Sequence, residues 1–345
     1  MNHERVAWVD YAKGLCIILV VMMHCVLNYG DQVGGRGWLH EVVDFARPFR
    51  MPDFFLLSGL FLGLSINSPL LDYIDRKVIH FAYFYLLWLA IQLGFVYDEQ
   101  LLGEPAVWAA RYLWALVEPT NTLWFVHMLA IFYIVSRIVR RLPKLLVLGV
   151  AAALQVAYQA DLINSDWRVV NHFVERYVFF FAGYAYAPLV FEWARRVAAR
   201  PAVALSGLLV WALINGALVK LHVHEAPVVG LVLGFVGAAA IVSFGSLMAG
   251  HDWAKPLRYA GRNSIVIYLS FFLPMELMFK LLLRTQIIPD IGTATAVITA
   301  VAAITPLLFH WAIKRTPLNF LYVRPAIFRL STYLPSAKAA AAAAS

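Results

Sequence analysis

The chain has 345 residues, of which 62 % are hydrophobic and only 14 % are charged, and its mean hydropathy is +0.73. This composition excludes a soluble globular protein, because a single core could not bury so much apolar side chain. The formal net charge of +8 does not require nucleic acid as a partner, because membrane proteins also collect Lys and Arg on their cytoplasmic loops. We therefore predict an all-α, polytopic integral membrane protein.

Apolar runs of about 18 or more residues are typical of membrane-spanning helices, and the sequence predicts ten of them. They cover residues 8–29, 50–66, 79–96, 121–139, 143–160, 169–187, 202–219, 228–248, 264–283 and 292–312. With the amino terminus inside, 18 Lys and Arg residues fall on the inner side and 9 on the outer side, and Lys13 within the first helix completes the 28. This asymmetry predicts that both termini are cytoplasmic.

The predicted transmembrane domain covers residues 1–330, and no second domain is visible. Residues 331–345 end in low-complexity alanine. They are predicted to form a flexible tail, either an artificial extension or a frayed end.

The first run carries three ionisable side chains, Asp10, Lys13 and His24. Lys13 and His24 fall within about 20° of one another around the helix and about 16 Å apart along its axis, and Asp10 lies on the same stripe. Such groups in hydrocarbon cost several kcal/mol unless they face a protein interior or a watery cavity. The helix is therefore predicted to line a site. The alternative for His24 is an interior histidine whose hydrogen bonds are satisfied.

The second run begins with two arginines, Arg47 and Arg50, and with Asp53, which shares a helix face with Arg50. Arg76 and Lys77 stand at the inner end of the third helix. They either anchor that end at the cytoplasmic surface or bind an anionic ligand.

Polar side chains also occupy the outer ends of the fourth and sixth helices. Trp124 and His127 begin the fourth helix, and His127 is either a packed residue or a functional one. His172, Glu175 and Arg176 form one polar face near the outer end of the sixth helix. Buried charge at that depth indicates a functional site, and a structural Glu–Arg pair is the alternative.

Arg262 and Asn263 precede an apolar helix at the inner side. A helix amino terminus of this kind is either an anion site or a good cap. Zinc-ligand spacings, Walker and Rossmann motifs and G-x-S-x-G are absent from the sequence, so no metal is predicted.

Four short motifs together carry a resemblance to a known family. They are Asp10-Tyr11-x-Lys13-Gly14 with His24 eleven residues after Lys13, Phe49-x-Met51-Pro52-x-Phe54-Phe55-x-x-Ser58-Gly59, Leu123-Trp124-Phe125, and Gly261-x-Asn263-Ser264. The chain resembles the membrane-bound acyltransferase family 3, and most nearly its fucose O-acetylase-like and exopolysaccharide-modifying branch. The resemblance covers essentially the whole chain. It implies a ten-helix enzyme of the bacterial inner membrane that moves an acyl group, usually acetyl, from cytoplasmic acyl-CoA to a hydroxyl of an extracytoplasmic or lipid-linked sugar.

The inner basic end suits the donor, acetyl-CoA. The candidates for binding its phosphates are Lys13, Arg76, Lys77, Arg262 and Asn263. An extended pantetheine arm of about 15–20 Å would lift the thioester toward His24. His24 is then either a general base on the acceptor hydroxyl or an acyl carrier, with Asp10 as the second catalytic candidate.

The outer polar side chains suit a glycan or lipid-linked oligosaccharide acceptor, because carboxylate, guanidinium, amide and aromatic groups match a sugar's hydroxyls and apolar face. The candidates are Asn28, Arg47, Arg50, Asp53, Ser58, Trp124, His127, His172, Glu175 and Arg176. They predict an outward-open cavity bounded by the first, second, fourth and sixth helices. Two alternatives stay open: a transporter or flippase for a lipid-linked sugar, and a non-catalytic lipid or sugar sensor. The oligomeric state is open as well.

Overall fold

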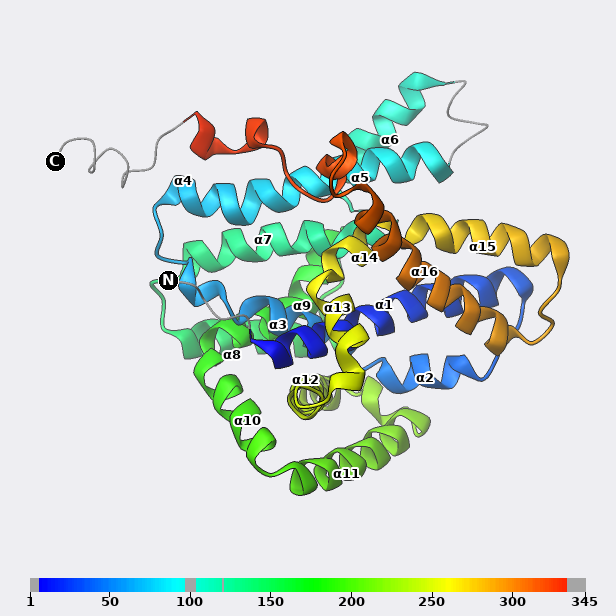
Figure 1. Ribbon diagram of the computed structural model, residues 1–345. Coiled ribbons are helices and arrows are strands. Elements are labelled where there is room, and N and C mark those ends of the chain that lie inside the picture. The colour runs from blue at the N-terminus through cyan, green and yellow to red at the C-terminus, as the bar shows by residue number, and fades with distance from the viewer. Residues whose placement is uncertain (1–5, 97–103, 120, 334–345) are drawn as a thin grey trace. The chain divides into compact units, whose positions relative to one another are not determined.

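The computed structural model describes residues 6–96, 104–119 and 121–333, and these residues form helices and connecting turns with no strand (Figure 1). The predicted all-α class is confirmed. Most of the predicted tail, residues 334–345, lies outside the described residues. The chain divides into two compact units. Unit 1 comprises Met1–Leu60, Leu148–Asn164 and Val174–Leu307, and unit 2 comprises Phe61–Val147, Ser165–Phe173 and Leu308–Ser345.

Many of the helices are short, and most of them belong entirely to one of the two units. Unit 1 contains α1 (Ala7–Val33), α2 (Leu39–Ala46), α3 (Arg50–Gly59), α10 (Ala187–Ala199), α11 (Pro201–Lys220), η4 (Val223–Glu225), α12 (Pro227–Met248), η5 (Asp252–Ala254), α13 (Lys255–Arg262), α14 (Ser264–Ser270) and α15 (Phe272–Thr285). Unit 2 contains η1 (Leu62–Leu64), α4 (Leu70–Tyr73), η2 (Ile74–Ile79), α5 (His80–Val96), α6 (Pro105–Val117), η3 (Asn121–Leu123), α7 (Trp124–Val139), η6 (Pro317–Leu321), η7 (Ala326–Phe328) and η8 (Leu330–Thr332). The boundaries between the units fall within α8 (Lys144–Gln159), α9 (Arg168–Ala185) and α16 (Ile291–Ile313).

Within the described chain, five helices are long and apolar enough to cross a membrane, or six if α14 and α15, which meet at a 48° bend, count as one span. The five are α1, the continuous stretch Leu70–Phe95, α11, α12 and α16. This number is below the ten predicted. The difference has a physical cause, because several apolar runs continue past the ends of their helices. In the predicted run 50–66 the α-helix α3 covers only ten residues, and α7 and α8 have 16 residues each. Helices of these lengths reach about 15 Å and 24 Å, whereas a hydrocarbon core is about 30 Å thick.

The longest described helix, α1, lies at the centre of unit 1, where α3, α12 and α13 pack against it (Figure 1). Its contact with α13 depends on two glycines. A Cβ atom added at Gly14 would collide with the carbonyl oxygen of Leu257, and one added at Gly261 would collide with that of Asp10. The two helices therefore touch backbone to backbone, and this contact fixes the face that α1 presents to the rest of the unit.

A second glycine contact joins α3 to α9. A Cβ atom at Gly59 would collide with the carbonyl oxygen of Phe180, and one at Gly183 would collide with that of Leu56. Because small residues let two helices approach closely, this contact holds α3 against the part of α9 that belongs to unit 1.

We expect Gly261→Ala to lower the Tm of the detergent-purified protein, because the added methyl group must push α13 away from the backbone of α1. Overpacking of this kind typically costs about 1–3 kcal/mol. Gly207→Ala is the matched control, since a Cβ atom there meets nothing within 4 Å and Ala favours a helix over Gly. Thermal unfolding monitored by fluorescence compares the two. Equal Tm values would show that the contact between α1 and α13 is not tight.

Candidate active site

His24 lies on α1 at a break in the helical structure of unit 1. Its ring packs against Phe271, with the ring centroids 5.4 Å apart, and Phe271 is the residue at which α14 ends and α15 begins. The charge of Arg50 on α3 acts on His24, which places the guanidinium group near the imidazole. Helix breaks inside membrane proteins are tolerated where they line a cavity or are buried in protein. The sequence-predicted catalytic histidine thus meets a broken helix and a cation.

Asp53 brings a carboxylate into the same region. Its exposed fraction is 1 %, and neither carboxylate oxygen has a hydrogen-bond partner of ordinary geometry among the described residues. The neighbouring polar groups are the thiol of Cys16, which is fully buried, and the guanidinium of Arg50. A buried carboxylate without hydrogen bonds is costly. Groups of this kind concentrate at functional sites.

Arg50 connects the members of this cluster. Its Nη1 donates to the carbonyl oxygen of Val43 over 3.4 Å, and its buried Nε has no hydrogen-bond partner among the described residues. The charge of Arg50 also acts on Arg176 of α9, which forms an ion pair with Glu175. The structure therefore brings together three residues that the sequence singled out, His24, Arg50 and Asp53, and adds Cys16. We call His24, Arg50, Asp53 and Cys16 the buried polar cluster, in which Cys16 and Asp53 are buried and His24 and Arg50 are partly exposed. Its thiol was not predicted as a site residue, and the only signal for it was its place one turn after Lys13.

Asp10 belongs to another part of α1. Its carboxylate lies 3.6 Å from Nε of Arg258 on α13 and is buried. Fourteen residues along a helix separate it from His24 by about 21 Å. Asp10 therefore ties α13 to the amino-terminal end of α1 instead of contacting the imidazole. Nothing in the residues around Asp10 indicates Arg258 as its partner.

Three further candidates remain in unit 1 near this helix. Lys13 and Asn28 are both partly exposed and share the face of α1 that carries His24. The charge of Lys13 acts on Cys16. Ser58 donates its hydroxyl to the carbonyl oxygen of Phe54 within α3, over 2.8 Å.

A polar cavity of about 750 Å³ lies in unit 1 beside α2 and the end of α11. Its lining residues are Arg36, Glu41, Asp44, Phe45, Arg47, Gly216, Val219, Lys220, His222 and His224. Asp44 accepts hydrogen bonds from Arg36 over 2.5 Å and from Arg47 over 3.2 Å. The charge of Arg47 also acts on Arg50. The predicted substrate residue Arg47 thus links this cavity to the buried polar cluster.

His224 was not predicted. It is 7 % exposed and lines the cavity, and neither ring nitrogen has a hydrogen-bond partner of ordinary geometry among the described residues. Burial lowers the pKa of His224, so the ring is neutral at pH 7 and can both donate and accept a hydrogen bond. The sequence does not indicate that His224 lines a cavity, because a histidine in a short connection between two helices is usually a surface residue without a specific role.

Unit 2 holds a basic cavity of about 630 Å³. Its lining residues are Asp75, Arg76, His80, Tyr322, Val323, Arg324 and Arg329. Asp75 is buried and accepts hydrogen bonds from Arg324 over 3.0 Å and from the backbone N–H of Leu330 over 2.8 Å. This ion pair neutralises one arginine, whereas Arg76 and Arg329 are exposed at the cavity.

Arg76 lies in η2, a π-helical segment. π-Helical segments are rare in proteins, and those that occur are often found at functional sites. The sequence predicted Arg76 as a ligand residue but missed Arg324 and Arg329, since basic residues near the carboxyl terminus looked like ordinary topology determinants.

The other residues predicted to bind acetyl-CoA do not line this cavity. The ammonium group of Lys77 lies over the ring of Tyr133, 4.8 Å from its centroid. Arg262 is exposed at the end of α13 in unit 1. The side-chain amide of Asn263 donates to the carbonyl oxygen of Tyr259 over 2.8 Å, so it bonds back to α13 and does not cap α14.

The aromatic candidates of unit 2 pack with one another. The rings of Trp124 and His172 stack, with centroids 4.4 Å apart. His127 is 3.0 Å from the carbonyl oxygen of Leu116 through Nε2, which agrees with the alternative of a packed residue. The outer candidates therefore divide between the two units. The common cavity predicted from all of them stays a prediction.

Comparison with known proteins bears on this arrangement. A family profile described as an acyltransferase domain, that of the acyltransferase 3 family, matches residues 6–314. The chain belongs to the acyltransferase 3 family. The resemblance stated from the motifs is confirmed. The inner membrane protein YcfT of Escherichia coli (strain K12) is 23 % identical to this acyltransferase 3 member over 309 residues, which cover 82 % of this chain and 83 % of the relative. No solved structure matches the chain.

Family membership and the apolar helices together make the chain a multi-pass membrane protein of an acyltransferase family. Acyl transfer needs a base or nucleophile near a group that stabilises developing negative charge. The buried polar cluster contains an imidazole and a guanidinium, which are groups of these two kinds. In the part of the chain that the structure describes, no group of three or more His, Cys, Asp or Glu side chains could hold a metal ion.

We expect Arg324→Met to lower the Tm of the purified protein, because it leaves the buried carboxylate of Asp75 without its cation. Breaking a buried pair in this way typically costs about 3–5 kcal/mol. The double variant Asp75→Asn/Arg324→Met should recover much of the loss, since no charge is then stranded. Arg329→Met, at the exposed rim of the same cavity, is the control. A double variant no more stable than Arg324→Met would show that the two side chains are not coupled.

Proposed function

We propose that the chain is an O-acyltransferase that moves an acetyl group from cytoplasmic acetyl-CoA to a hydroxyl of an extracytoplasmic or lipid-linked glycan, such as an exopolysaccharide unit. The observation that supports this most is that Arg50 lies close to both His24 and Asp53 in a member of the acyltransferase 3 family. The three side chains supply a base, a cation and a carboxylate in one apolar unit.

In the proposed reaction His24 acts as general base. Its free ring nitrogen takes the proton of the acceptor hydroxyl while the hydroxyl oxygen attacks the thioester carbonyl carbon. Arg50 stabilises the negative charge that develops on the carbonyl oxygen. The carbon–sulfur bond then breaks, and His24 returns the proton to the departing CoA thiolate. In the alternative relay, His24 takes the acetyl group itself and passes it to the hydroxyl in a second step.

We assign the phosphates of acetyl-CoA to the basic cavity of unit 2. Its volume of about 630 Å³ is within the range of small-molecule sites. Arg76 and Arg329 offer guanidinium groups, which bind phosphate through paired hydrogen bonds. Arg324 positions the segment that carries Arg329, because it is fixed by Asp75.

We assign the acceptor to the polar cavity of unit 1. Phe45 provides an apolar surface for a sugar ring, and Glu41, Arg47 and His224 provide groups for its hydroxyls. The charge of Arg47 acts on Arg50, so this cavity adjoins the buried polar cluster in which the hydroxyl would react.

We place the protein in the inner membrane of a bacterium with both termini in the cytoplasm. The excess of Lys and Arg on the inner loops supports this orientation, and the related YcfT is an inner membrane protein.

We expect His24→Ala to reduce acetylation of the glycan by about 10²–10⁴-fold, the usual contribution of a general base. The assay measures ester-linked acetate on polysaccharide made by membranes that carry each variant. His127→Ala is the control histidine, and we expect it to retain activity, since its ring makes a packing contact to Leu116. Size-exclusion profiles confirm that both variants remain folded. Residual activity of His24→Ala above about a tenth of wild type would contradict the base role.

We expect Arg76→Ala and Arg329→Ala to raise the KM for acetyl-CoA and to leave kcat nearly unchanged, because a phosphate contact contributes equally to the ground state and the transition state. Raised salt should weaken donor binding by the wild type in the same way, since both arginines are near water. Arg315→Ala, an exposed arginine of unit 2 that does not line the cavity, is the matched control. A loss of kcat with unchanged KM would show that the phosphates of acetyl-CoA do not bind in this cavity.

We expect cysteines introduced at Asp31 and at Ala199 to react with membrane-impermeant reagents from opposite sides of the membrane. Both positions are exposed, at the ends of α1 and α10. The native Cys16 and Cys25 are buried, so they give little background. Labelling of both positions from one side would refute the orientation.

A further inference from the structure

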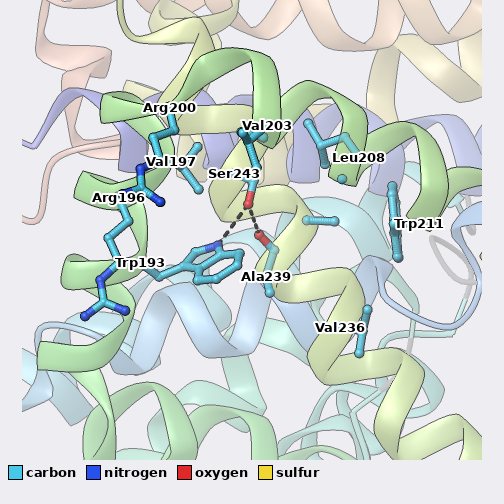
Figure 2. A pocket seen from close by; sticks show the side chains of 13 residues that line it. Trp193, Arg196, Val197, Arg200, Val203, Leu208, Trp211, Val236, Ala239 and Ser243 are labelled. Atoms are coloured by element: carbon cyan, nitrogen blue, oxygen red, sulfur yellow. Dashed lines mark hydrogen bonds between the residues drawn. The ribbon is translucent and has the colours of Figure 1, made fainter.

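Two apolar grooves run along α10 in unit 1, one on each side of Trp193. The first has a volume of about 530 Å³ and lies between α10, α11 and α12 (Figure 2). The second has a volume of about 310 Å³ and is lined mainly by apolar side chains of α10 and α12. Trp193 and Ala239 line both grooves, so the indole stands between them.

The indole is fixed in this place by hydrogen bonds. Its N–H donates to the hydroxyl of Ser243 over 2.9 Å, and that hydroxyl donates to the carbonyl oxygen of Ala239 over 2.8 Å (Figure 2). Both polar atoms are therefore satisfied within the protein. Trp193 acts as a rigid apolar partition, and neither groove requires a polar ligand along its length.

The first groove has a wall that is both apolar and exposed. Its outer wall, α11, has a mean hydropathy of 2.1 over its most apolar window, and only 11 % of that window is buried. Such a surface in a membrane protein contacts acyl chains, and side chains of this composition cannot face water over a whole span.

Arginines line part of the first groove, and Figure 2 shows two of them, Arg196 and Arg200, on α10 and at its end. Nε of Arg196 is 2.9 Å from Glu192, a carboxylate that also pairs with Arg195. Within the described chain, the side chain of Arg200 has no hydrogen-bond or ion-pair partner, and no acidic residue lines either groove. Arg195 and Arg196 thus share one carboxylate and Arg200 pairs with none among the described residues, which leaves positive charge at this part of the first groove.

We propose that these grooves bind one anionic diacyl phospholipid, with an acyl chain on each side of Trp193 and the phosphodiester at Arg196 and Arg200. Two apolar grooves that share Trp193 as a wall match two chains, and the excess of guanidinium groups at the first groove matches an anionic headgroup. Basic pockets between membrane helices on the cytoplasmic side bind anionic lipids in this manner. The inference does not depend on the proposed acyl transfer.

Native mass spectrometry of the detergent-purified protein with added phosphatidylglycerol or phosphatidylcholine tests it. We expect wild type to retain one phosphatidylglycerol at concentrations where phosphatidylcholine is lost. Arg196→Gln/Arg200→Gln should weaken phosphatidylglycerol retention by about tenfold or more, since each cation near an anionic lipid contributes. Arg195→Gln, on the same helix but outside both grooves, should change it little. Equal retention of the two lipids by wild type, or equal effects of the double variant and Arg195→Gln, would overturn the proposal.

A second variant tests the groove itself. Gly207 lines the first groove, and a Cβ atom there meets nothing within 4 Å, so Gly207→Leu fills the groove without a clash at that atom. We expect it to abolish retention of phosphatidylglycerol. Gly149→Leu on α8 is the matched control, because that glycine also has open space around it and lies outside the grooves. Retention by Gly207→Leu equal to that of Gly149→Leu would refute lipid binding in the groove.

Discussion

Burial of charge inside an apolar helical unit is the constraint on which this structure depends. Asp53 is almost completely buried, Arg50 lies close to it, and the charge of Arg50 also acts on His24. Desolvating such groups costs several kcal/mol each unless they serve one another or a ligand. The unit can hold them because α1 touches α13, and α3 touches α9, through glycines that allow backbone contact. Close contacts of this kind prevent the helices from separating to let the charges reach water.

The same constraint explains why most of the buried charged side chains form ion pairs. Asp10 and Arg258 neutralise each other at one end of α1, and Asp75 and Arg324 do so in unit 2. Glu175 and Arg176 form a third pair. Against this background Asp53 stands out, since both of its oxygens are buried and neither has a hydrogen-bond partner of ordinary geometry among the described residues. A buried carboxylate in this state costs stability, and groups of this kind concentrate at functional sites.

The parts of this arrangement that were predictable from sequence are local ones. Helical spacing placed Lys13 and His24 on one face of α1 and placed Arg50 with Asp53, and the short motifs indicated the family. Contacts between distant segments were not predictable. Nothing in the residues near Asp10 indicates Arg258, and nothing near Arg76 indicates Arg329. The number of spanning helices was overestimated because apolar composition does not show where a helix ends, as α3 illustrates by ending at Gly59 within an apolar run.

The central claim is that the buried polar cluster carries acyl transfer from a CoA thioester to a glycan hydroxyl. The most direct measurement uses purified wild-type protein in proteoliposomes, with radiolabelled acetyl-CoA supplied on one side and the polysaccharide on the other. The account predicts release of CoA thiol that depends on the polysaccharide, with the label recovered as an ester on the glycan in equal amount. Unlabelled glycan, with acetyl-CoA intact after many hours, would contradict it.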